Sequence, residues 1–304
     1  MTEKNTPLVF DGHNDTVLNL HQKERGQGRN FFEESQIGHI DLPRARKGGL
    51  GGGFFAMFAP TEKRDPGAWP TDELQPTVDP DHALKYTISL AARFLNLVRE
   101  AGGQVALVKT ADDLEACLRD GVLAMVMHIE GAEAIDPGLD SLYVFHGAGL
   151  RSIGPVWSRP NIFGTGVPFS FPGSPDIGPG LTEEGKALVR ACNRLGVLVD
   201  VSHLNEKGFW DIARISDAPL VATHSNAHAI SASPRNLTDK QLDAIGESGG
   251  IVGVNFHVSF LRPDGQKDVE TPLADIRRHA QYIADRIGIE HVGLGSDFDG
   301  ALMP

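Results

Sequence analysis

The sequence lacks the residues that would place it in several common classes of protein. It has two cysteines among 304 residues, Cys117 and Cys192, and no C-x-x-C pair, which excludes a disulfide-stabilised scaffold and is typical of a reducing compartment. No apolar run approaches the ~20 residues needed to span a membrane. Residues 1–7 lack the apolar stretch of a signal peptide. We therefore expect a cytoplasmic protein with no membrane partner.

Positive charge is scarce as well. The chain carries 28 Lys and Arg against 40 Asp and Glu, a formal net charge of -12, with no dense basic cluster that could follow a phosphate backbone. Nucleic acid is therefore excluded as a partner. A hydrophobic fraction of 40% in a chain of this length is sufficient for a large buried core.

Several sequence motifs of enzymes are missing or incomplete. No H-E-x-x-H occurs, and the glycines at 51–53 are not followed by the lysine of a phosphate-binding loop. Residues 246–250 match G-x-S-x-G, but a predicted helix precedes the serine and a predicted strand follows it. A nucleophile elbow needs the opposite order, so this match indicates the end of a helix.

The chain does contain a repeated alternation of apolar runs and amphipathic segments. Eight apolar runs end near residues 15, 58, 130, 157, 203, 225, 256 and 297. Helices are predicted at 81–100, 111–120, 139–147, 182–195, 205–215, 238–247 and 272–287, with loops at 20–47 and 60–80. Fully apolar strands that alternate with helices favour a covered parallel sheet, and eight such units favour an α/β fold of the (β/α)8 TIM-barrel type.

No interdomain linker is evident, so we expect residues 1–304 to form a single barrel domain that carries the catalytic site. The chain stops at Pro304, shortly after the eighth predicted strand. We therefore expect the C-terminal helix that would close the barrel to be missing from this chain.

Polar residues recur where the predicted strands end, which is where barrels of this type carry their active sites. These residues are His13, Asp15, Glu130, Trp157, His203, His224 and Asp297. Each has an ordinary structural explanation when taken alone, such as a helix cap or a loop histidine. Their recurrence on independent strands favours one shared site. Histidine and carboxylate ligands without cysteine suit zinc or a similar divalent ion.

Five ligands exceed what one open catalytic site uses and suit two ions that share a carboxylate. His13 and Asp15 are two residues apart on a strand and therefore point to the same side. Glu130 is the natural bridge between the ions. Two ions lower the pKa of a water held between them towards about 7, which supplies a hydroxide nucleophile at neutral pH.

Six short motifs together resemble the membrane dipeptidase (renal dipeptidase) family of zinc peptidases. They are DGHND at 11–15, IEG at 129–131, VSH at 201–203, THS at 223–225, SPRN at 233–236 and GSDFDG at 295–300. The resemblance covers nearly the whole chain and implies a binuclear zinc site in a (β/α)8 barrel of the metal-dependent hydrolase type. It implies a zinc-dependent dipeptidase that hydrolyses the peptide bond of dipeptides by a metal-bridging hydroxide, with tolerance of D-residues at the second position.

The resemblance also assigns roles to individual residues. His13 and Asp15 would bind one Zn2+, His203 and His224 the other, and Glu130 both, so that each chain holds two ions. Asp297 matches the family's acid/base carboxylate.

Arg235 matches the arginine that holds the dipeptide's C-terminal carboxylate, a role that suits a guanidinium fork. Well-known members carry a substrate-binding histidine where this chain has Trp157, whose indole N–H can donate one hydrogen bond. Arg159 is a candidate replacement for that histidine, and His257 is a candidate pocket residue beyond the seventh strand.

Two other interpretations stay open at the level of sequence. One is an amidohydrolase that acts on another small, carboxylate-bearing amide, and the other is a catalytically silent metal-binding or interaction protein. The intact ligand set and Asp297 argue against the silent protein. Apolar surface on the barrel helices would permit a homodimer.

Overall fold

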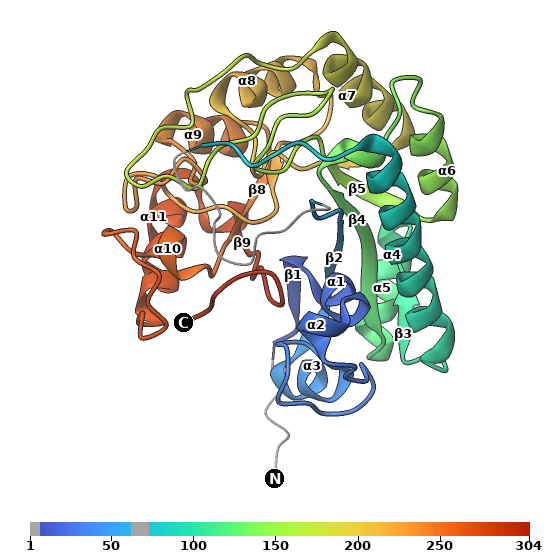
Figure 1. The fold of residues 1–304 in the computed structure, drawn as a ribbon. Coiled ribbons are helices and arrows are strands. Elements are labelled where there is room, and N and C mark those ends of the chain that lie inside the picture. Colours follow the sequence, from blue (N-terminus) through green and yellow to red (C-terminus); the bar gives the residue numbers. More distant parts are fainter. Residues whose placement is uncertain (1–6, 62–72) are drawn as a thin grey trace.

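The computed structural model describes residues 7–61 and 73–304, and its centre is a nearly closed barrel of parallel strands (Figure 1). The eight barrel strands are β1 (Val9–Asn14), β2 (Leu50–Phe58), β4 (Leu123–Glu130), β5 (Leu150–Gly154), β6 (Leu198–Val199), β7 (Val221–Ala222), β8 (Ile251–Val254) and β9 (Val292–Leu294). Their order around the sheet is β6-β5-β4-β2-β1-β9-β8-β7. A parallel bridge between Asp200 and Val221 joins the two ends. The predicted (β/α)8 barrel is confirmed.

Strand β3 (Val105–Leu107) lies outside this ring and pairs with the first residues of β4. All eight residues of β4 are buried, as expected for a strand with its neighbours on both sides and helices over its outer face. Because both faces of β4 are buried, its sequence is a nearly continuous apolar run.

Helices surround the strands (Figure 1). They are α1 (Thr16–His21), α2 (Lys23–Gly26), α3 (Leu42–Gly48), α4 (Pro80–Glu100), α5 (Ala111–Asp120), α6 (Asp140–Ala148), α7 (Glu183–Leu195), α8 (Glu206–Ile215), α9 (Asp239–Glu247), α10 (Val258–Leu261) and α11 (Ala274–Ile287), with short 3-10 helices η1 (Ala132–Ala134) and η2 (Ile289–His291). The seven predicted helices are present within one or two residues of their expected bounds. Among the described residues, no helix is both long and apolar enough to cross a membrane.

The prediction of a loop over residues 20–47 was wrong in part, because this range contains the end of α1, all of α2 and most of α3. Helix α3 begins after Asp41, whose carboxylate accepts the Arg44 backbone N–H at 2.9 Å, and it ends at Gly49 in the left-handed conformation. Such short helices give too few turns for a hydrophobic period to be visible in the sequence. Most of the predicted excursion at 60–80 lies outside the described residues.

Three glycines shape the interior of the barrel beneath the predicted site. A Cβ atom at Gly12, Gly253 or Gly295 would lie 2.3 Å or less from the carbonyl oxygen of Thr223. No side chain tolerates that distance, so glycine at these positions allows the backbone after β7 to pack closely against the neighbouring strands. The glycines thereby bring His224, the next residue, to the barrel axis.

His279 on α11 is a buried histidine away from the predicted metal ligands, and it supports a prediction about stability. Its Nδ1 accepts the Ala227 backbone N–H at 3.1 Å, and its Nε2–H donates to the Leu261 carbonyl at 3.0 Å. Burial lowers the pKa of this imidazole to about 4. The unfolded chain, with an ordinary pKa of about 6.5, therefore binds the proton more readily than the folded protein does.

The contribution of His279 to stability is full above about pH 6.5 and is lost as the pH falls towards 4. We expect the protonation of His279 to lower the unfolding free energy of the wild type by about 2 kcal/mol when the pH falls from 7 to 5. A His279→Gln variant lacks the titrating group and should lose less stability over this interval. Urea unfolding of both proteins at the two pH values measures the difference, and parallel losses would contradict the prediction.

Candidate active site

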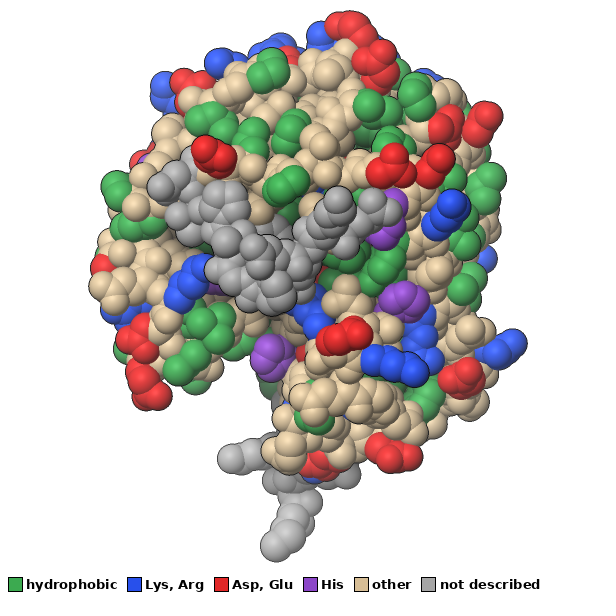
Figure 2. All heavy atoms as spheres, in the orientation of Figure 1, with side chains coloured by type: hydrophobic (Ala, Val, Ile, Leu, Met, Phe, Trp, Pro, Cys, Tyr) green, Lys and Arg blue, Asp and Glu red, His purple; other side chains and the backbone are tan. Residues whose placement is uncertain are grey.

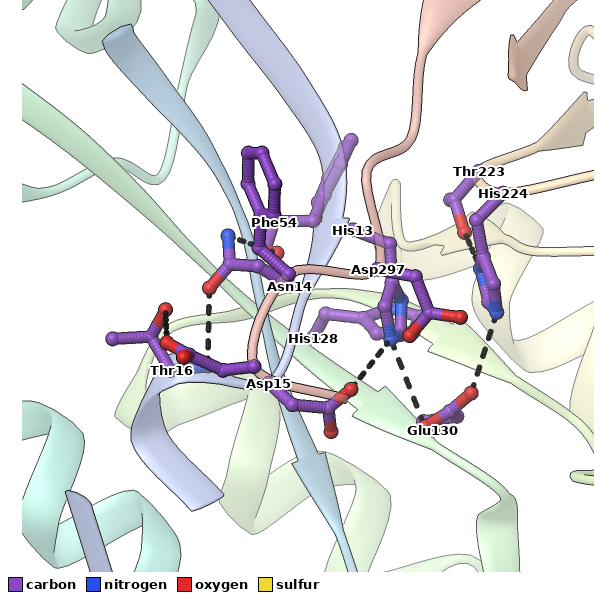
Figure 3. Close-up of polar contacts among 12 residues, drawn as sticks. His13, Asn14, Asp15, Thr16, Phe54, His128, Glu130, Thr223, His224 and Asp297 are labelled. Atoms are coloured by element: carbon purple, nitrogen blue, oxygen red, sulfur yellow. Dashed lines mark hydrogen bonds and ion pairs between the residues drawn. The ribbon is translucent and has the colours of Figure 1, made fainter. Parts of the chain in front are cut away.

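The residues predicted to form the site lie at the carboxyl ends of five strands. His13 is near the end of β1, Asp15 follows that strand, and Glu130 is the last residue of β4. His203, His224 and Asp297 lie in the turns after β6, β7 and β9. Figure 3 shows His13, Asp15, Glu130, His224 and Asp297 around one centre.

Two of these residues adopt a backbone conformation that is uncommon for residues other than glycine. His203 has a φ of 66° and Asp297 a φ of 60°, both in the left-handed region. The Asp297 backbone is tied down, since its N–H donates to the His13 carbonyl at 2.9 Å. Strained conformations of this kind are maintained by surrounding structure and gather at functional sites.

The imidazole Nε2 atoms of three histidines converge on the Glu130 carboxylate. His203 Nε2 lies 3.0 Å and His224 Nε2 3.5 Å from Glu130 Oε1, while His13 Nε2 lies 3.7 Å from Oε2. His13 Nε2 is also 3.6 Å from Asp15 Oδ2. Glu130 thus places one oxygen towards His13 and Asp15 and the other towards His203 and His224, as a bridging ligand would.

The donor set fits divalent metal ions. Neither ring nitrogen of buried His13 has a hydrogen-bond partner among the described residues, an arrangement that is costly unless something else binds the ring. The Nε2 atoms of His203 and His224 lie 3.0 Å apart. Two sets of three residues, His13–Glu130–His224 and His13–Asp15–Asp297, each have ligand atoms close enough to hold one ion. Nitrogen and carboxylate oxygen ligands of this kind suit zinc.

The pKa values of the buried groups indicate that the protein alone does not neutralise the carboxylates of the site. Burial raises the pKa of Glu130 to about 8 and also raises that of Asp297. Burial opposes protonation of His13, but Glu130, Asp15 and Asp297 outweigh it and raise the His13 pKa. Burial lowers the pKa values of His203 and His224 well below 6.5, so both rings are neutral donors of a lone pair at pH 7. Neutral imidazoles beside crowded carboxylates favour a bound cation.

A cavity of about 390 Å³ opens above this cluster. Asp15, Glu130, His203 and Asp297 line it together with an aromatic wall, whose members are Phe58, Trp157, Phe169, Phe171 and Phe260. This volume falls in the range of small-molecule sites, and an apolar wall with a few polar groups is typical of them. Figure 2 shows histidine, lysine and arginine side chains on the surface of one face of the molecule.

Trp157 lines the cavity as part of this wall. Its ring lies 4.8 Å from Phe58, 5.5 Å from Phe169 and 5.8 Å from His203, measured between ring centroids. Strand β5 ends at Gly154, so Trp157 belongs to the loop that follows and not to the strand itself.

Arg235 is buried beside the cluster but is not among the side chains that line the cavity. Its Nη2 donates to the His224 carbonyl at 3.0 Å, and its Nη1 lies 3.4 Å from Ser225 Oγ. The guanidinium also lies over the ring of Phe260, a cavity residue, at 5.5 Å. The buried Arg235 Nε has no partner within the described structure.

The two further residues that the sequence suggested for the substrate pocket, Arg159 and His257, lie in different environments. Arg159 is fully buried, and its guanidinium donates to Glu133 at 2.8 Å and to the Ala59 carbonyl at 2.7 Å. The suggestion that Arg159 replaces the family histidine was wrong, because this ion pair holds it behind the wall. His257 does line the cavity, with its Nδ1 accepting the Ser259 backbone N–H.

Sequence reasoning missed two buried residues beneath the cluster, His128 and Asp200. His128 was assigned a surface or general structural role, yet its ring lies 5.4 Å from that of His13 and its Nε2 is 3.8 Å from Asp200 Oδ2 (Figure 3 shows His128 beside His13). The only available signal was that both residues lie near the end of a barrel strand.

The fold and this cluster define a class of protein, a (β/α)8-barrel hydrolase with a histidine and carboxylate centre able to bind metal. Residues 3–304 match the membrane dipeptidase family, peptidase family M19. The chain belongs to this family, and it is a metal-dependent dipeptidase, a hydrolase of peptide bonds.

Relatives of known structure are similar over nearly the whole chain. A metallopeptidase from Rhodobacter sphaeroides, liganded with a phosphinate mimic of the dipeptide L-Ala-D-Ala, is 49% identical with a TM-score of 0.94, covering 99% of this chain and 88% of that one. The metallopeptidase named dipeptidase AC is 51% identical with a TM-score of 0.93, covering 99% and 87%. An uncharacterised dipeptidase from Schizosaccharomyces pombe is 31% identical, covering 96% of this chain and 69% of that protein.

Proposed function

We propose that this enzyme is a zinc dipeptidase that hydrolyses dipeptides, including those with a D-residue at the second position. The observation that carries the proposal is the position of Glu130 between His13 and Asp15 on one side and His203 and His224 on the other. This arrangement supports two Zn2+ per chain, with Glu130 as the shared ligand.

When bound, two ions in such a centre would polarise the peptide carbonyl and lower the pKa of an attacking water. The protein's own groups would do the remaining work. Asp297 receives a hydrogen bond from Asn255 Nδ2 at 3.0 Å on its Oδ2, which orients the carboxylate. Burial raises the pKa of Asp297, which suits a group that takes a proton from water and delivers it to the leaving amine.

Arg235 would bind the dipeptide's C-terminal carboxylate from its position beside His224, and this contact would limit substrates to two residues. The aromatic wall at Phe58, Trp157 and Phe169 would pack against substrate side chains. The relative liganded with a mimic of L-Ala-D-Ala supports acceptance of a D-residue at the second position.

A panel of dipeptides tests this function. Zinc-loaded protein should hydrolyse several dipeptides, with L- and D-residues compared at the second position, and should not release the terminal residue from tripeptides at a similar rate. N-acyl amino acids and cyclic amides in the same panel test the alternative amidohydrolase activity. No turnover of any dipeptide by folded, zinc-replete protein would exclude the proposed function.

Substitution of Arg235 tests how the substrate is held. Arg235→Gln should lower kcat/KM for dipeptides about 10- to 100-fold, mainly through KM, because a charge-assisted pair with the carboxylate is lost. The same variant should act on dipeptide amides almost as the wild type does, since these substrates lack the carboxylate.

The exposed Arg119→Gln on α5 is the matched control and should keep wild-type kinetics. Equal losses on dipeptides and their amides would remove Arg235 from carboxylate binding.

We further propose that residues 1–304 act as one catalytic domain. A homodimer and a cytoplasmic location remain predictions, which gel filtration with light scattering and cell fractionation would test.

A further inference from the structure

Asp200 is a buried carboxylate that lies directly behind the cluster and has no role in the proposed reaction. It follows β6, has only 1% of its surface exposed, and accepts three hydrogen bonds. Its Oδ1 accepts the backbone N–H groups of Ser202 and Thr223, each at 2.9 Å. Its Oδ2 accepts the Thr223 hydroxyl at 2.6 Å.

These contacts set the direction of a chain of hydrogen bonds that ends at a proposed metal ligand. An ionised carboxylate only accepts, so the Thr223 hydroxyl proton points to Asp200. The Thr223 oxygen then offers a lone pair to His224 Nδ1, 2.8 Å away, which must carry the proton. His224 Nε2 is consequently left with its lone pair, and it faces Glu130 (Figure 3 shows the contacts of Thr223 with His224 and of His224 with Glu130).

We propose that Asp200 is a positioning residue, which acts through Thr223 to hold His224 in the Nδ1–H tautomer and to aim its Nε2 at the metal centre. Histidine ligands depend on such outer partners for ring orientation and basicity. The inference rests on the proposed ligation of metal by His224, and it assigns the metal-orienting role to a residue that no sequence motif marked.

A second arrangement of Asp200 is excluded by its contacts. His13, His128 and Asp200 offer ligand atoms that lie close together, as a further metal site would require. However, both Asp200 oxygens are already occupied by N–H and O–H donors at 2.6 to 2.9 Å. The nearest imidazole nitrogen of His128 is 3.8 Å away. Asp200 therefore supports the neighbouring histidine and does not act as a ligand itself.

The substitution Asp200→Asn keeps the shape of the side chain but reverses the donor and acceptor roles along the hydrogen bonds from residue 200 through Thr223 to His224. Its Oδ1 can keep both backbone N–H groups, but its Nδ2 donates where Oδ2 accepted, so the Thr223 hydroxyl must turn towards His224 Nδ1. His224 is then protonated on Nε2, the atom that should bind metal. We expect Zn2+ to bind the His224 site roughly 10- to 100-fold more weakly, measured by competition with a chromophoric chelator.

Thr223 provides a second pair of variants that keeps the test independent of folding. Thr223→Val removes the hydroxyl at nearly constant volume and should weaken Zn2+ binding to a similar extent. Thr223→Ser keeps the hydroxyl and should restore affinity to near the wild-type value. The double variant of Asp200→Asn with Thr223→Val should be no weaker than either single variant, because both interrupt one chain.

Nitrogen NMR of the histidine rings in metal-free protein reports the tautomer directly, without any assay of activity. His224 should appear as Nδ1–H in the wild type and in Thr223→Ser, and as Nε2–H in Asp200→Asn. Asp41→Asn is the matched control, since Asp41 is a buried carboxylate that caps α3 and accepts the backbone N–H groups of Ser35 and Arg44, neither of which is a proposed ligand or a cavity residue. It should lower stability and leave Zn2+ affinity unchanged.

Wild-type Zn2+ affinity and an unchanged His224 tautomer in folded Asp200→Asn and Thr223→Val would overturn the inference. A His224→Ala variant separates this failure from failure of the proposed site. If His224→Ala loses affinity while Asp200→Asn does not, only the inference is wrong. If His224→Ala binds Zn2+ as tightly as the wild type, the proposed ligation and the inference are both wrong.

Discussion

Glu130→Ala is expected to lose both metal ions and all dipeptide turnover above background. Among the described residues, Glu130 is the one carboxylate within 3.7 Å of the Nε2 atoms of His13, His203 and His224, so its removal would take a ligand from each proposed ion. The histidines would then face one another with no shared anion between them. Metal content after dialysis, determined by elemental analysis, should fall from about two ions per chain, the stoichiometry of a shared-carboxylate site, to nearly none.

The control for this prediction is Glu115→Ala, which removes an exposed carboxylate from α5 and should keep both metal and activity. Circular dichroism should show that Glu130→Ala remains folded, because burial raises the pKa of Glu130 and its ionised form is therefore unfavourable in the folded protein. One tightly held ion in the wild type, or one retained by Glu130→Ala, would refute the bridging role.

Asp297→Asn is expected to retain both ions and to lose about 100- to 10,000-fold in kcat, the range for removal of a general acid or base. The carboxamide keeps the shape of the side chain but cannot take a proton from water. Because substrate binding does not depend on that proton, KM should change little. Steady-state kinetics on the best dipeptide of the panel, with metal content measured on the same sample, would separate the two effects.

Asp120→Asn, at the exposed end of α5, is the matched control for an aspartate remote from the cavity. Turnover by Asp297→Asn equal to that of the wild type would remove Asp297 from the mechanism. Loss of metal together with turnover would instead make Asp297 a ligand, which its place beside His13 and Asp15 also permits.

The strands show which features of the fold were readable from the sequence. Strand β4, which is buried on both faces, appears as a continuous apolar run and was located correctly. Strands β5, β6 and β7 end at residues 154, 199 and 222, three or four residues before the predicted ends at 157, 203 and 225. Helices of nine residues or more were found through their period. The short helices α2 and α3 were not, since their stability comes from Asp41, Gly49 and contacts with the rest of the chain.

The start of α4 shows that the sequence does not fix which residue caps a helix. The sequence predicted that this helix begins at residue 81, but in the structure it begins at Pro80 and is capped by Asp79, whose carboxylate accepts the His82 N–H at 2.9 Å. Pro80 then occupies the first helical turn, where its missing N–H costs nothing. The sequence has one aspartate on each side of Pro80, and both are suitable residues to cap a helix.

The sequence by itself determined the barrel class, the family and the residue types at the strand ends, because periodicity and strand-end chemistry are local properties of the chain. Only the tertiary structure decided which groups support the proposed ligands. Asp200 and Thr223 are 23 residues apart and meet because β6 and β7 close the barrel. Arg159 is held away from the cavity by Glu133, which belongs to the 3-10 helix η1. Hydrogen bonds between distant segments depend on closure of the whole sheet, and no spacing along the chain encodes them.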